Sequence, residues 1–320
     1  MKRCRKFTLQ MLKSITRDTQ HYLYLCNIKI REQRSMIAKV ITGLVVAFTS
    51  ISSVAQNVEL KMNNNMNKKE QVVALLKSIE TGDTAPIAFI NADNYKQHNL
   101  GIKDGLSGFG TILAALPQGS ARVHTVRAFQ DGDFVFTHTD YNFFGPKIGF
   151  DIFRFEGDKI VEHWDNLAET PTKANPSNRT MIDGTTELKD LDKTTTNKAL
   201  VEQFVRDVLM GQAPDKLASY FDGDKYIQHN PNIADGLSGL GAALAEMAKN
   251  GITMTYERIH KVLGEGNFVL VVSEGSFAGK HVSFYDLFRI EAGKISEHWD
   301  VIEPLLPQSE WQHQNGKFGF

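Results

Sequence analysis

The chain has 320 residues, of which 42% are hydrophobic and 23% charged, and its formal net charge at pH 7 is −1. This composition predicts a globular chain with room for two domains and excludes a disordered or fibrous protein. Residues 1–55 hold ten basic and two acidic residues, so the remainder carries a net charge of about −9, which argues against a nucleic-acid-binding surface.

Residues 36–55 have the pattern of an export signal. Lys39 supplies a positive charge, residues 40–48 are apolar, and residues 53–55 read Ser-Val-Ala, a small-x-small cleavage site. The apolar stretch is shorter than the roughly 20 residues that a membrane anchor needs, so we favour a signal peptide over an anchor. Residues 1–35 then lie upstream of the true start and contribute no fold. We expect a periplasmic or secreted protein without membrane contact after cleavage.

Both cysteines, Cys4 and Cys26, precede this signal. The chain that follows it contains no thiol, which excludes a cysteine nucleophile, a disulfide framework and a cysteine-based metal site.

The rest of the chain contains an internal repeat. The run YKQHNLGIKDGLSGFG at residues 95–110 matches YIQHNPNIADGLSGLG at residues 226–241, and EHWD occurs at both 162–165 and 297–300. A repeat of this length indicates duplicated domains and not a solenoid. The predicted organisation is domain 1 at 67–170, a linker at 171–195, domain 2 at 196–305 and a tail at 306–320. The linker is rich in Pro, Thr, Asn and Gly and is expected at the surface, and the tail is expected to be poorly held.

Within each copy, the patterns predict helices first and strands afterwards. Apolar residues at helical spacing predict a first helix over 69–79 and 197–210, and shorter helices are expected over 84–92, over 215–221 and through each LSG segment. Turn signals separate the strands predicted in the first copy, at 122–129, 134–141, 148–155 and 159–167. This order predicts an α+β fold in which three helices pack on one face of a curved antiparallel sheet.

Each copy carries YxQHN, then DGLSG, then a hairpin that ends in EHWD. These motifs resemble those of SnoaL-like polyketide cyclases in the nuclear transport factor 2-like superfamily. The resemblance covers both copies and implies two tandem cone-shaped domains. Members of the superfamily include cyclases that catalyse an intramolecular aldol condensation, ketosteroid isomerase and scytalone dehydratase, but also non-catalytic binding modules. The resemblance therefore implies either aldol-type or isomerase-like proton transfer, or binding of a small hydrophobic ligand, or assembly.

The EHWD segments place chemically different residues on the two faces of a strand. Because alternate side chains share a face, His163 and Asp165 point one way while Glu162 and Trp164 point the other. A carboxylate in an apolar cone loses hydration, which raises its pKa toward that of a base able to remove a proton next to a carbonyl. A nearby imidazole or phenol can then donate a hydrogen bond to the developing enolate oxygen.

On this reasoning, the candidate catalytic residues are the two aspartates as bases and four histidines as donors or orienting groups: Asp165, His163, His98, Asp300, His298 and His229. The candidate pocket residues are Tyr95, His138, Tyr141, Trp164, Tyr226 and Trp299. We expect a small hydrophobic carbonyl compound as substrate or ligand and no cofactor. We expect no metal either, because no HxxxH helix or dense carboxylate set supports one.

Structural interpretations remain open beside these functional ones. His98 and His229 could satisfy local backbone groups, and each HWD segment could be a strand end whose Asp bonds its own His and whose Trp fills the core. The DGLSG segments predict helix N-caps at Asp104 and Asp235.

Two further expectations concern pairs of residues. We expect Asp151 with Arg154, and Asp286 with Arg289, to form either a structural ion pair or a solvated strand face. His138 and Tyr141 occur only in the first copy, where the second has Val272 and Gly275, so we expect unequal pockets without ranking them. The two sheets are expected to pack on each other as an intramolecular version of a dimer.

Overall fold

The computed structural model describes residues 66–320, apart from residue 118. The upstream segment and the expected signal peptide lie outside these residues, and export stays a prediction. Among the described helices, none has the length and apolar character required to cross a membrane.

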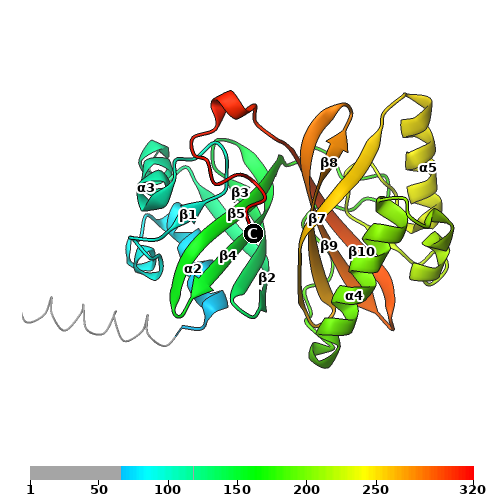
Figure 1. The fold of residues 1–320 in the computed structure, drawn as a ribbon, viewed down its shortest axis with the longest axis horizontal. Coiled ribbons are helices and arrows are strands. Elements are labelled where there is room, and N and C mark those ends of the chain that lie inside the picture. Colours follow the sequence, from blue (N-terminus) through cyan, green and yellow to red (C-terminus); the bar gives the residue numbers. More distant parts are fainter. Residues whose placement is uncertain (1–65, 118) are drawn as a thin grey trace, which may run out of the picture. The chain divides into compact units, whose positions relative to one another are not determined.

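The first domain contains two α-helices, a 3₁₀ helix and five strands (Figure 1). They are α2 (Lys68–Thr81), η1 (Ala85–Phe89), β1 (Lys96–Gln97), α3 (Gly105–Ala115), β2 (Arg122–Asp131), β3 (Phe134–Asn142), β4 (Pro146–Glu156) and β5 (Lys159–Glu169). The strands form one sheet in the order β1-β5-β4-β3-β2, in which β1 is parallel to β5 and the other pairs are antiparallel.

The second domain repeats this plan, with strand order β6-β10-β9-β8-β7. Its elements are η2 (Leu191–Lys193), α4 (Thr194–Phe204), the π-helical turn η3 (Val205–Leu209), η4 (Pro214–Tyr220), β6 (Ile227–Gln228), α5 (Gly236–Lys249), β7 (Met254–Glu265), β8 (Phe268–Phe277), β9 (Lys280–Glu291), β10 (Lys294–Pro304) and η5 (Gln308–Glu310). The expected α+β fold with two tandem domains is confirmed. Turns at Gly132, Gly157 and Gly293, all with positive φ, end the hairpins where the turn signals placed them.

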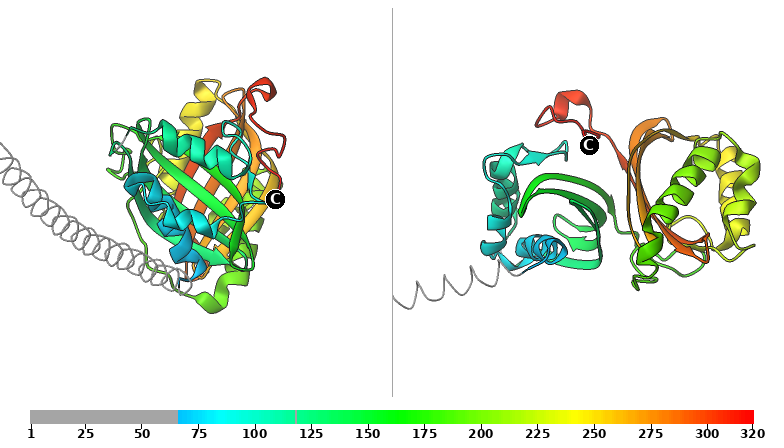
Figure 2. Two further views of the ribbon diagram at one scale, coloured as in Figure 1. Left: turned by 90° about the vertical axis from the view of Figure 1, so that its left-hand side faces the viewer. Right: turned by 60° about the horizontal axis from the view of Figure 1, so that its bottom comes forward.

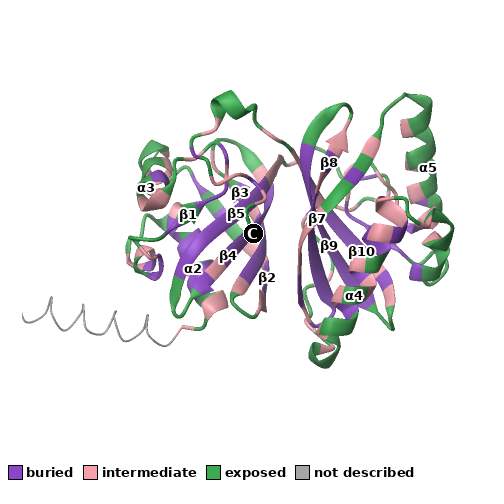
Figure 3. Cartoon of the chain, viewed as in Figure 1, coloured by how far each residue is buried: buried purple, intermediate pink, exposed green. Residues whose placement is uncertain are grey.

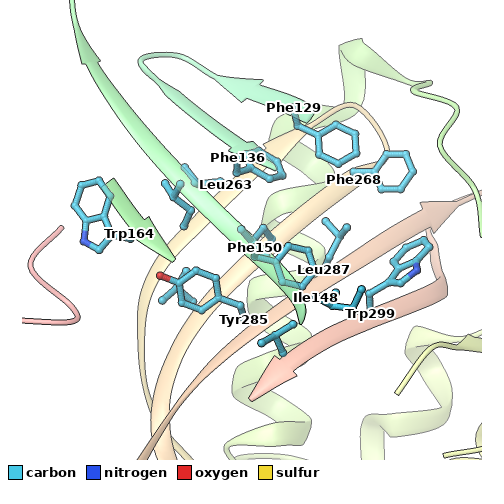
Figure 4. Packing of buried hydrophobic residues seen from close by; sticks show 14 of the residues in the cluster. Phe129, Phe136, Ile148, Phe150, Trp164, Leu263, Phe268, Tyr285, Leu287 and Trp299 are labelled. Carbon is cyan, nitrogen blue, oxygen red and sulfur yellow. The ribbon is translucent and has the colours of Figure 1, made fainter. Parts of the chain in front are cut away.

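Three apolar clusters hold these layers together. In each domain, one cluster fills the space between the helices and the sheet, and the strands are largely buried (Figure 3). The third cluster lies between the two sheets, whose outer faces carry the helices (Figure 2). Figure 4 shows this interdomain cluster, to which the first domain contributes Phe136, Phe150 and Trp164, and the second Tyr285 and Trp299.

Strands β5 and β10 meet across this interdomain cluster. The side-chain amide of Asn166 on β5 donates to the carbonyl oxygens of Ser283 and Val301, at 2.9 Å each. Because Asn166 is completely buried, its Nδ2 group is satisfied by these two carbonyls and not by water.

The linker and the tail are both held by many contacts. The expectation that the tail is poorly held is wrong, because His313 and Lys317 are buried against the first domain and the backbone N–H of Gln312 donates to the carbonyl of Leu100 at 2.9 Å. The linker packs against the second domain, where Asn175 Nδ2 donates to the carbonyl of Gln228 at 2.7 Å.

Candidate functional site

Two carboxylates and an imidazole gather on the helix-facing side of each sheet. The register of β9 and β10 sets Asp300 directly opposite Asp286, and His298 lies two residues earlier on the same face. One potential ligand atom from each of these three residues lies within 4.8 Å of the others. The first domain repeats the group with Asp151, His163 and Asp165. The structure thus brings the predicted His-Asp pairs together and adds Asp286 and Asp151.

The hydrogen bonds of His298 fix its protonated nitrogen. Gln228 Oε1 accepts from the backbone N–H groups of His229 and Asn230 at 2.9 Å each, so it is the amide oxygen and not the nitrogen. His298 Nδ1 lies 3.1 Å from this oxygen and must donate to it, while Nε2 lies 3.0 Å from Asp286 Oδ1. One further proton therefore lies between His298 and Asp286, as an imidazolium facing a carboxylate or an imidazole facing a carboxylic acid.

A tyrosine hydroxyl donates to the central carboxylate in both domains, but from different strands. Tyr141 on β3 donates to Asp151 Oδ2 at 2.6 Å, whereas Tyr256 on β7 lies 3.3 Å from both oxygens of Asp286. Burial, strengthened by the neighbouring carboxylate, raises the pKa of both phenols well above the usual range. The second site therefore has a phenol beside its central carboxylate although Gly275 stands at the position of Tyr141, and sequence reasoning missed Tyr256.

Side-chain volume explains why the tyrosine comes from β3 in the first domain and from β7 in the second. The ring of Tyr141 covers Gly149, where an added Cβ would come within 3.2 Å of the ring. In the second domain the large and small residues are reversed, because Gly275 stands at the position of Tyr141 and Phe284 at that of Gly149. Tyr256 then stacks on Phe284 with ring centroids 4.0 Å apart.

Asp300 has one oxygen bound and one left free. Asn230 Nδ2 donates to its Oδ2 at 2.7 Å, while Oδ1 is buried with no hydrogen-bond partner among the described residues. Burial raises the pKa of Asp300 above its usual range, and the Asp286 carboxylate adds to this effect against the attraction of His298. Asn99 holds Asp165 Oδ2 in the same way at 2.7 Å. Both asparagines belong to the repeated QHN motif, the one signal that could have identified them.

A cavity of about 580 Å³ opens over the second-domain carboxylates. Apolar side chains from α5 and the sheet form most of its wall: Leu240, Leu244, Met247, Met254, Phe277, Phe288 and Ile302. The polar groups of the site also line it: Tyr226, Gln228, Asn230, Asp286, His298 and Asp300. Four further polar residues complete the polar lining: Glu169, Asn232, Glu246 and Asn250. Ala168 and Met181, from the end of β5 and from the linker, complete the wall.

The remaining predicted histidines and tryptophans lie on the opposite face of each sheet. His229 stacks on Trp299 with centroids 4.6 Å apart, and His98 stacks on Trp164 at 4.4 Å. The sheet therefore separates His98 and His229 from the aspartates that they were expected to accompany. The two tryptophans lie on the face that strand alternation predicted, and they do not line the helix-facing pocket. Tyr95, by contrast, is buried in the helix-facing core of the first domain.

The glutamate of each EHWD segment binds the arginine that was expected to pair with an aspartate. Arg289 Nε donates to Glu297 Oε2 at 2.6 Å, and His229 Nε2 lies 2.8 Å from Oε1. Burial alone would raise the pKa of Glu297, but these bonds outweigh it and lower the pKa to about 2. Arg154 likewise binds Glu162. The expected Asp151–Arg154 and Asp286–Arg289 pairs are therefore wrong, because the aspartates face the other side of the sheet.

Three other predicted residues also have roles within the fold. His138 lies between the sheets, with Nδ1 3.2 Å from Arg127 Nη1, and burial lowers its pKa well below the usual range. Asp104 and Asp235 occupy the expected N-cap positions, but neither side chain bonds its own helix. They accept instead from the backbone N–H groups of Gln97 and Gln228, at 2.9 and 3.0 Å.

Comparison with known proteins finds a family match over the second domain. A family model described as a SnoaL-like domain matches residues 201–298. No curated protein matches the chain.

Three bacterial proteins are among the solved structures that are similar to this chain, and each covers about one domain of it. An NTF2-like protein of unknown function from Cytophaga hutchinsonii is 13% identical, with a TM-score of 0.29, covering 32% of this chain and 92% of its own. A protein of unknown function with a cystatin-like fold from Xanthomonas campestris is 22% identical, with a TM-score of 0.29, covering 37% and 98%. An LEH-like epoxide hydrolase from M. tuberculosis is 22% identical, with a TM-score of 0.27, covering 35% and 85%.

Proposed function

We propose that the second domain binds a small apolar carbonyl compound and catalyses proton transfer on it, as in an isomerisation or an aldol-type cyclisation. The observation that carries this proposal is the buried, unpartnered Oδ1 of Asp300 beside an apolar cavity of about 580 Å³. The SnoaL-like match over residues 201–298 supports the same class of reaction. Export of the protein remains part of the proposal and rests on the signal pattern of residues 36–55.

Asp300 is the base in this mechanism. Asn230 holds Oδ2, so Oδ1 is the atom available to a ligand. A raised pKa makes the carboxylate a stronger base than an exposed aspartate, and it takes the proton from the carbon next to the ligand carbonyl. The same proton can then return to another carbon, which gives an isomer.

Tyr226 is the donor best placed for the carbonyl oxygen. Its hydroxyl oxygen accepts from Gln228 Nε2 at 3.2 Å, and its hydrogen has no acceptor among the described residues. Burial raises the pKa of Tyr226 well above the usual range, so the phenol stays protonated and can stabilise an enolate by hydrogen bonding. His298 and Asp286 hold each other and Gln228 in place, and act as positioning residues.

The same hydrogen bonds argue against a metal at this site. The three ligand atoms are close enough to bind one ion. However, Gln228 occupies Nδ1 of His298 and Asp286 faces Nε2, so a metal would have to displace the bond between His298 and Asp286.

The proposal is tested by hydrogen exchange on 2-tetralone, a bicyclic ketone that is small enough for the cavity. The full chain in D₂O should accelerate exchange of the protons next to the carbonyl, as followed by proton NMR. Asp300→Asn should slow this exchange by roughly 10²- to 10⁴-fold, the usual contribution of a general base, while leaving 2-tetralone binding in place. Asp158→Asn, the same change at an exposed turn, is the matched control and should leave the rate unchanged. Binding without accelerated exchange in the unmodified chain would instead favour a binding module.

A further inference from the structure

The linker docks on the second domain, and the tail docks on the first domain through equivalent contacts. The linker carbonyl of Thr180 lies 2.8 Å from His229 Nδ1, and the tail carbonyl of Gly316 lies 2.8 Å from His98 Nδ1. The residue before each of these carbonyls also has an equivalent partner, because linker Arg179 donates to Asp235 Oδ1 and tail Asn315 donates to Asp104 Oδ1. Each domain is thus completed by the segment that leaves the other domain.

This correspondence makes Met181 and Lys317 equivalent, because each follows the residue that bonds the histidine. Met181 lines the second-domain cavity together with Ala168. At the first-domain site, Glu303 from the end of β10 is the counterpart of Ala168 in the repeat, and Lys317 Nζ donates to it. Two apolar residues at one site are therefore replaced by an ion pair at the other.

Lys317 reaches the carboxylate oxygen that is free in the second domain. Its Nζ lies 3.7 Å from Asp165 Oδ1, the counterpart of Asp300 Oδ1. The Lys317 side chain is 4% exposed. Burial alone would lower the pKa of Lys317, but Glu303 and Asp165 outweigh it and raise the pKa, so the ammonium stays charged. A ligand that displaced it would leave the buried Asp165 and the partly buried Glu303 without their cation.

We propose that Lys317 determines which of the two equivalent sites takes the ligand: the tail closes the first-domain site with an internal ammonium, and an apolar molecule binds in the second-domain cavity. This inference rests on the proposed function only in taking that cavity as a ligand site. It assigns Met181 and Ala168, both supplied from outside the second domain, as the residues that keep the cavity apolar.

The number of bound ligands tests this assignment. We would titrate the full chain with the neutral apolar fluorophore N-phenyl-1-naphthylamine and measure the stoichiometry by fluorescence and by native mass spectrometry. The unmodified chain should bind one molecule. Glu303→Ala with Lys317→Met, which copies the second-domain wall into the first domain, should bind two. Lys317→Arg keeps the charge and, as the matched control, should bind one.

The reciprocal change tests the assignment at the second-domain cavity, provided that the thermal unfolding transition is unchanged. Ala168→Glu with Met181→Lys transplants the ion pair and should abolish binding, and Ala243→Trp, which fills the cavity from α5, should do the same. Two molecules on the unmodified chain would overturn the assignment. So would one molecule on the double variant Glu303→Ala with Lys317→Met, if its thermal unfolding transition is unchanged. One bound probe without any exchange of 2-tetralone would overturn the proposed catalysis and leave this assignment standing.

Discussion

The carboxylates of the two sites differ in the groups that bind them. Asp300 keeps a free buried oxygen, Asp165 faces an ammonium, and Glu297 is bound by Arg289 and His229. Strand alternation is enough to predict that Asp300 and Glu297 lie on opposite faces. It cannot reveal Asp286 as the partner of His298, because that contact depends on the register between β9 and β10, which the pattern of one strand does not contain.

Glu297 should stabilise the fold in a pH-dependent way. Its folded pKa of about 2 lies below the ordinary value of 4.5, so its contribution is complete above pH 4.5 and is lost as the pH falls through 2. The shift corresponds to about 3 kcal/mol. Glu297→Gln should therefore lower the free energy of unfolding in urea by about that amount at pH 6 and by progressively less toward pH 2. The control Glu310→Gln, at an exposed residue, should leave the free energy of unfolding unchanged at both pH values. If the effect of Glu297→Gln did not vary with pH, this account would be contradicted.

At the scale of elements, the long strands and their glycine turns could be predicted because alternation and turn residues extend over many positions. The two-residue strands β1 and β6 could not, since so short a run has no period. These strands nevertheless set Gln97 and Gln228 opposite the site histidines. Tyr256 of the second site was also missed. It reaches Asp286 from β7, whereas Tyr141 reaches Asp151 from β3, so the repeat does not align the two tyrosines.

The two phenols should differ in energetic weight. Tyr141 makes one short bond to Asp151, whereas Tyr256 makes two long contacts with Asp286. Tyr141→Phe should cost about 1 to 3 kcal/mol in the free energy of unfolding, because it removes a buried donor from a charged acceptor, and Tyr256→Phe should cost less. Urea unfolding of the two variants gives the comparison. Equal costs would mean that the bond lengths do not report the strength of these contacts.

In the described molecule, the interdomain cluster joins two similar folds, and the linker and the tail each dock on the domain that they do not leave. Residues 66–320 form one compact unit. We infer that the two domains make, within one chain, the kind of pairing that two subunits make in a dimer. The duplication was visible in the sequence, but the difference between the two sites was not, because the residues that cause it lie in the linker and the tail and outside the repeated motifs.

This pairing predicts a single unfolding transition. Asn166→Ala should lower the unfolding temperature of both domains together, because it removes two buried hydrogen bonds between β5 and the strands of the second domain, each worth about 0.5 to 1.5 kcal/mol. Differential scanning calorimetry would show one shifted peak. Asn250→Ala, at an exposed helix end, is the control, and two separate peaks in the unmodified chain would refute the pairing.

The position of Lys317 also determines when each site is completed during synthesis. Lys317 is translated after both domains, so Asp165 lacks its cation while about 150 further residues are translated. The second domain needs no such delay, because Ala168 and Met181 have already emerged when its own strands appear. The half of the protein that is translated first is therefore the half that is finished last.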